Sequence, residues 1–138
     1  MIKSTLSFLS LAAILLFVAC NKSNNISPDV ATVASSGTWQ VSLFINSGQD
    51  ETAGFSGYSF TFNSNGALIT LKNGVSKNGT WNVNGSNQFN IDLGPKDNTN
   101  LPFGGLTHDW KILSVANTEI RLGDDNISSN EFLTFSKN

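Results

Sequence analysis

Apolar and polar residues alternate along most of the chain after Gly37, a pattern typical of β-strands that bury one face. In the first such stretch Trp39, Val41, Leu43 and Ile45 share one face, with polar residues on the other. Seven further stretches with this alternation predict strands at residues 58–62, 67–71, 81–83, 89–93, 107–115, 118–122 and 131–136.

Short polar links join most of these strands, and the Asn-Gly pairs at 65–66 and 73–74 supply the positive φ angles of tight hairpins. Two links are longer, at 46–57 and 94–106, and no stretch of ten residues shows helical periodicity. About eight sequential antiparallel strands can bury their apolar faces by closing into an up-and-down barrel, which also removes exposed edges. We therefore predict an all-β antiparallel barrel, with a two-sheet sandwich as the alternative.

The first twenty residues have the features of a bacterial export signal. Lys3 provides a positive charge, and Leu6–Val18 is an apolar stretch of thirteen residues, shorter than the roughly twenty that span a bilayer. The stretch ends in Ala19-Cys20, which resembles the cleavage site of lipoprotein signal peptidase. Cys20 is the only cysteine of the chain, and we expect it to carry the lipid once residues 1–19 are removed.

Several buried acyl chains would make this anchoring long-lived, so we expect the mature protein to be attached to the membrane through lipid. We interpret residues 20–36 as the lipidated cysteine and a flexible tether, because small and polar residues dominate them without periodicity. Residues 37–138 then form one domain. The expected location is the cell envelope, on the outer membrane, facing the periplasm or exposed at the surface.

Charge and composition narrow the class of partner. Without Lys3, seven basic residues face ten acidic ones, so the mature chain has a net charge of −3. Nucleic-acid binding requires a basic face, so this charge balance argues against that function. Asn, Ser, Thr and Gly are abundant, and eight Phe, three Trp and one Tyr supply a core between polar turns.

Six fragments, in this order and spacing, resemble the lipocalin-like domains of small bacterial lipoproteins. They are Gly37–Val41, Gly57–Phe62 before Asn65-Gly66, Gly79-Thr80-Trp81, Trp110–Ile112, Glu119–Leu122 and Phe132–Phe135. The resemblance implies a barrel in which Trp39 packs at the closed end and an arginine on a late strand, here Arg121, lies across it. Strand alternation favours instead an exposed Arg121, because Ile120 and Leu122 face the other side.

Residues with catalytic potential are few. His108 is the only histidine, and Asp109 beside it would point to the opposite face of a strand, so the two would not cooperate. The segment Asp124-Asp125-Asn126 lacks the spaced acidic residues of a calcium-binding loop, and its residue types predict a turn. We expect no enzyme activity, no metal site and no cofactor.

The leading hypothesis is a lipid-anchored, non-enzymatic barrel that binds a small apolar or amphipathic molecule, with residues 46–57 as a lid at one mouth. Seven aromatic residues would line or fill the interior: Trp39, Tyr58, Phe60, Phe62, Trp81, Phe89 and Trp110. The alternative is a solid barrel that acts as a structural or protein-interaction module, with an outer apolar patch of Phe44, Leu68 and Phe132. The protein partner it would have is not identified by the sequence.

Overall fold

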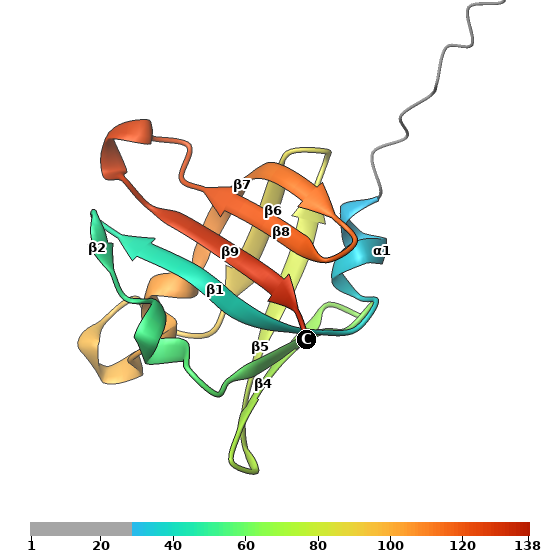
Figure 1. Ribbon diagram of the computed structural model, residues 1–138, viewed down its shortest axis with the longest axis horizontal. Coiled ribbons are helices and arrows are strands. Elements are labelled where there is room, and N and C mark those ends of the chain that lie inside the picture. The colour runs from blue at the N-terminus through green and yellow to red at the C-terminus, as the bar shows by residue number, and fades with distance from the viewer. Residues whose placement is uncertain (1–28) are drawn as a thin grey trace, which may run out of the picture.

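The computed structural model describes residues 29–138 (Figure 1). Cys20, the leader and most of the expected tether lie outside the described residues. Within residues 29–138, no helix has the length and apolar character needed to cross a membrane.

Nine antiparallel strands follow one another around a single sheet in nearly sequential order. They are β1 (Thr38–Asn46), β2 (Gln49–Asp50), β3 (Ser59–Phe62), β4 (Ala67–Lys72), β5 (Val75–Asn84), β6 (Gln88–Asp92), β7 (His108–Ala116), β8 (Glu119–Gly123) and β9 (Phe132–Lys137). β2 is a short addition that pairs with the end of β1, and eight strands form the wall.

The sheet closes because β1 pairs with the last strand as well as with β3. The ladder between β1 and β9 runs from Trp39 opposite Lys137 to Ile45 opposite Phe132. In Figure 1 these two strands lie side by side at the front of the molecule. The predicted all-β antiparallel barrel is thereby confirmed, and the two-sheet sandwich is wrong.

A short helix precedes the barrel within the segment interpreted as a flexible tether. α1 (Val30–Ala34) begins after Asp29, whose carboxylate accepts hydrogen bonds from the backbone N–H and the hydroxyl of Thr32. Val33 and Ala34 are buried in the barrel core. The tether interpretation is therefore wrong for residues 30–34, because a side-chain cap and two apolar contacts order a segment too short to show helical periodicity.

A β-bulge in β1 reverses the faces expected after Val41. Val41 lies opposite Phe135 and Leu43 opposite Thr134, so Ser42 is an extra residue in the ladder. Phe44 is consequently buried in the core, and Leu43 lies on the outside, half-buried. The expectation that Leu43 and Ile45 share the inner face with Trp39 is wrong for this reason.

The inner face of β4 also differs from the sequence prediction. Leu68 and Thr70 are fully buried, whereas Ile69 and Leu71 are exposed, because the pairing of Phe62 with Leu68 fixes the register. The Thr70 hydroxyl donates to the carbonyl oxygen of Lys77 at 3.2 Å, so this buried polar group has a hydrogen-bond partner. The side with more apolar residues therefore faces outward.

The two long links contain short 3-10 helices that cover one end of the barrel. These helices are η1 (Thr52–Phe55), η2 (Asn98–Asn100) and η3 (Phe103–Leu106). A fourth 3-10 helix, η4 (Ile127–Ser129), lies in the link between β8 and β9. Figure 1 shows η1 in green and η2 with η3 in orange at one end, and α1 at the other. We call the end covered by η1, η2 and η3 the mouth end, and the end that holds α1 the α1 end.

Candidate functional site

The aromatic residues expected in the interior do point inward. Trp39, Phe60, Phe62, Phe89 and Trp110 are exposed by 1% or less, and Trp81 by 6%. Tyr58 is the exception, because it is only half-buried at the mouth end, where its ring meets Phe103 edge-on.

These rings pack against one another across the barrel. Phe62 lies edge-on to Trp81, Phe89 and Phe135, with centroid separations of 5.2 to 5.4 Å. Phe60 meets Phe135 in the same way at 5.3 Å. Such contacts occupy the central space with protein, as small eight-stranded barrels can do. The interior is therefore a packed core of aromatic rings.

The α1 end is closed around Trp39. Its indole N–H donates to the carbonyl oxygen of Ala34 at 2.8 Å, which joins the ring to the end of α1. The cation over the ring is Lys137, whose Nζ lies 5.6 Å from the ring centroid and donates to the Ser36 hydroxyl. Arg121 is exposed on the outer face of β8, so the role that the resemblance implied for it is wrong. The sequence did not suggest Lys137, because the predicted strand ended at residue 136, whereas β9 extends to Lys137.

The mouth end is filled by residues of the two long links. Phe55 from η1 is 2% exposed and packs on Phe44, Phe60 and Phe103. The indole N–H of Trp110 donates to the carbonyl oxygen of Leu106 at 3.0 Å. The expected lid segment thus holds Phe55, a part of the core.

A side cleft opens in the barrel wall where β1 and β3 separate. The two strands pair only through Thr38 with Thr61 and Trp39 with Phe60, and η1 lies beyond that point. The space between them has a volume of about 500 Å³. It is lined by Gln40, Val41, Thr52, Ala53, Phe55, Ser56, Gly57, Tyr58, Ser59 and Asn138.

Two adjoining apolar cavities on the outer wall share Leu113 and Phe132. Their volumes are about 260 and 250 Å³, and Leu113 is 48% exposed. This is not the patch that the sequence suggested, because Phe44 and Leu68 are buried in the core and Phe132 alone of the three reaches the outside. Leu113 faces outward by alternation with Ile112, and a second bulge, at Leu113 in β7, places Ser114 on the outside as well.

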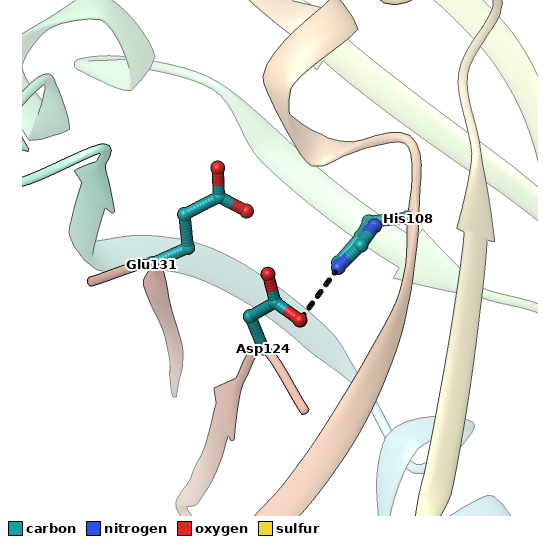
Figure 2. A group of neighbouring side chains, drawn as sticks. All are labelled: His108, Asp124 and Glu131. Atoms are coloured by element: carbon teal, nitrogen blue, oxygen red, sulfur yellow. Dashed lines mark ion pairs between the residues drawn. The ribbon is translucent and has the colours of Figure 1, made fainter. Parts of the chain in front are cut away.

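A polar cluster of His108, Asp124 and Glu131 lies at the mouth end (Figure 2). His108 begins β7, Asp124 follows β8, and Glu131 precedes β9. His108 Nε2 lies 3.6 Å from Asp124 Oδ1, and its Nδ1 lies 3.1 Å from Lys96 Nζ. Asp109 follows His108 in the sequence. The carboxylate next to the imidazole, however, is that of Asp124, which the pairing of β7, β8 and β9 brings close.

Hydrogen bonds keep Asp124 ionised. The backbone N–H of Asn126 donates to Oδ1 at 3.0 Å. This bond, then the Ser129 hydroxyl, hold the pKa of Asp124 below its ordinary value, with a smaller contribution from nearby His108. Asp124 therefore serves both as the cap of the turn after β8 and as the anionic neighbour of His108.

Comparisons with known proteins identify the fold. No protein-family model and no curated protein matches the chain. Solved structures that are similar to it include two proteins from Bacteroides species. A DUF4847 family protein from Bacteroides vulgatus has a TM-score of 0.59 and 18% identity, covering 80% of this chain and 98% of that one. A lipocalin-like protein from Bacteroides uniformis has a TM-score of 0.52 and 18% identity, covering 76% and 99%.

This chain has a lipocalin-like fold. At such low identity the similarity concerns the fold alone. In this lipocalin-like barrel the central space is filled by aromatic rings, and the openings lie in the wall and at the mouth end.

Proposed function

We propose that this protein is a lipid-anchored, non-enzymatic binding module of the cell envelope that takes a small, uncharged, amphipathic ligand. The ligand would bind in the side cleft, since packed rings occupy the barrel centre. The observation that carries this proposal is the separation of β1 from β3 after Trp39 and the cleft that it opens.

The size and lining of the side cleft support a small amphipathic ligand. Its volume of about 500 Å³ falls in the usual range of roughly 300–1,000 Å³ for ligand sites. Val41, Phe55 and Tyr58 supply apolar surface, while Gln40 and several hydroxyl groups can form hydrogen bonds. The lining residues carry no charged side chain, which favours an uncharged ligand over a carboxylate or a phosphate.

The anchoring and the non-enzymatic role rest on the sequence. The lipid on Cys20, the first residue that remains once residues 1–19 are removed, would hold the domain at the outer membrane. The chain has one histidine and one cysteine, and that cysteine is the expected lipid site. This composition supports binding rather than catalysis by a nucleophile and a base.

The alternative of a structural or protein-interaction module is less well supported. It was motivated by an outer patch of three residues, and two of these, Phe44 and Leu68, belong to the core.

Titration with Nile red, an uncharged apolar probe that fluoresces in apolar surroundings, tests the cleft. The mature chain carrying Cys20→Ser should take up the probe saturably, with one site per molecule. Ala53→Trp should block uptake, because Ala53 lines the cleft and a large ring would fill it. Ala116→Trp is the matched control, since Ala116 is an exposed alanine at the end of β7.

Two results would contradict the cleft proposal. One is the absence of saturable uptake by the folded chain, and the other is equal uptake by the two tryptophan variants. The anchoring is tested separately, by mass spectrometry of the native protein for a diacylglycerol thioether on Cys20. An unmodified Cys20 in the membrane fraction would contradict the anchoring and leave the cleft result unaffected.

A further inference from the structure

His108, Asp124 and Glu131 come from three strand ends that barrel closure brings to one place. Asp124 and Glu131 flank the link between β8 and β9, where the backbone N–H of Asp124 donates to the carbonyl oxygen of Glu131 at 3.1 Å. The side chain of His108, from β7, points toward the Asp124 carboxylate, and that of Glu131 lies on the far side of Asp124, as Figure 2 shows. One ligand atom from each residue lies within 4.8 Å of the other two.

The His108 imidazole directs an unpaired nitrogen into this group. Nε2 is shielded from solvent and has no hydrogen-bond partner, because Asp124 Oδ1 at 3.6 Å is too distant. Edge-on contact with the Trp110 ring, at a centroid separation of 5.0 Å, holds the imidazole in place. A shielded nitrogen without a protein partner is unusual in a folded domain, and an ion bound among these three side chains would satisfy it.

We propose that His108, Asp124 and Glu131 bind a divalent transition-metal ion, with zinc as the best fit. Imidazole nitrogen and carboxylate oxygen are both zinc ligands, and three protein ligands leave a fourth position for water. The nitrogen ligand disfavours calcium and magnesium, which prefer oxygen alone. The site lies outside the side cleft, so it stands or fails independently of the proposed function.

Small side-chain movements suffice to form the site. Bonds of about 2.0–2.2 Å to a tetrahedral zinc ion place the ligand atoms roughly 3.3–3.5 Å apart. The ligand atoms, within 4.8 Å of one another, must therefore approach by at most about 1.5 Å. Glu131 is half-buried on the link between strands and has the torsional freedom to do so.

Lys96 competes with a metal ion for this site. Its Nζ lies 3.1 Å from His108 Nδ1, which can accept a hydrogen bond only when Nε2 carries the ring proton. Metal coordination at Nε2 moves the proton to Nδ1, so Lys96 must turn away. Lys96 is exposed on the link between β6 and β7 and is free to move. Its removal should therefore strengthen metal binding.

Calorimetric titration of the metal-free mature chain with zinc chloride tests the proposal, with Cys20→Ser to remove the only thiol. We expect one zinc ion per chain. His108→Ala and Glu131→Gln should each weaken binding by more than about tenfold, since even changes to outer-shell partners weaken it about 10–100-fold. Lys96→Met should strengthen binding, and Asp125→Asn, an exposed neighbour outside the cluster, should leave it unchanged.

The single histidine also gives a direct spectroscopic readout. Zinc should shift the Nε2 resonance in a long-range proton–nitrogen spectrum, and this resonance has no other histidine with which to be confused. Failure of the folded chain to bind zinc would overturn the proposal. So would binding that His108→Ala and Glu131→Gln both retain at full affinity, or a shift at Nδ1 in place of Nε2.

Discussion

The indole N–H of Trp39 donates a hydrogen bond to the carbonyl oxygen of Ala34 at 2.8 Å, and both residues are fully buried. This bond joins the first strand of the barrel to the helix that closes its α1 end. It explains why a five-residue helix is ordered, since helices of that length are not stable alone.

We predict that Trp39→Phe lowers the free energy of unfolding by about 1–3 kcal/mol, because it leaves the buried carbonyl oxygen of Ala34 without a donor. Urea unfolding followed by circular dichroism measures the loss. Trp81→Phe is the control, because its indole N–H donates to the backbone carbonyl oxygen of Asn63, which also accepts a hydrogen bond from the backbone N–H of Gly66. Equal losses in the two variants would show that the Ala34 bond contributes nothing specific.

The bulge in β1 predicts opposite sensitivities for two adjacent residues. Phe44→Ala should lower the free energy of unfolding by about 3–5 kcal/mol, because Phe44 is 1% exposed and packs on Phe55. Leu43→Ala should lower it by about 1 kcal/mol or less, since Leu43 lies on the outer wall. Chemical unfolding of both variants checks this, and the reverse order would mean that β1 alternates without a bulge.

Gly79 in β5 should tolerate no side chain. A Cβ there would lie 2.2 Å from the carbonyl oxygen of Asp92 and 2.8 Å from Leu93 Cδ2, so the backbone itself must shift. We expect Gly79→Ala to lower the free energy of unfolding by about 1–3 kcal/mol. Thermal melts of this variant and of Ser76→Ala check the prediction. Ser76→Ala should be nearly neutral, because Ser76 is at an exposed position of the same strand. A neutral Gly79→Ala would place β6 further from β5.

Acid should destabilise the domain in part through Asp29. Hydrogen bonds from the hydroxyl and then the backbone N–H of Thr32 hold the pKa of Asp29 below its ordinary value of 3.8. The contribution of the carboxylate to stability is therefore complete above 3.8 and is lost as the pH falls through the lowered folded-state value.

Asp29→Asn removes this titration and keeps an oxygen that can cap α1. The melting temperature of the unmodified chain should exceed that of the variant at neutral pH, and the difference should shrink in acid. Melts from neutral pH to well below 3.8 measure it. A difference that is constant with pH would contradict the role assigned to the charged cap.

The sequence predicted the barrel because most strands keep strict alternation over their whole length. In β3 and β6 the apolar residues of the pattern, such as Phe60 and Ile91, are the buried ones. Alternation fails where a bulge inserts a residue, as at Ser42 and Leu113, because neither residue type marks the insertion. In β4 it fails because the outer residues Ile69 and Leu71 are more apolar than the inner pair, Leu68 and Thr70.

The polar cluster could not be predicted from the sequence alone. His108 and Asp124 are neighbours only because β7, β8 and β9 pair in a particular register, which the bulge at Leu113 alters by one residue. The sequence also could not predict that the barrel centre is packed, because inward-facing aromatic residues can either line a cavity or fill it. Phe55 and Phe103, the rings that cover the mouth end, lie in links with no alternation.

The pairing of β1 with β9 has a consequence for how the domain is made. β1 can pair with β9 only when nearly the whole chain is present, because Trp39 lies opposite Lys137 in the ladder. Contacts so distant in sequence are formed slowly, and until then β1 and β8 are open edges. Open edges invite pairing between chains, so incomplete molecules that lack β9 should aggregate, while the finished barrel offers little edge to a neighbour.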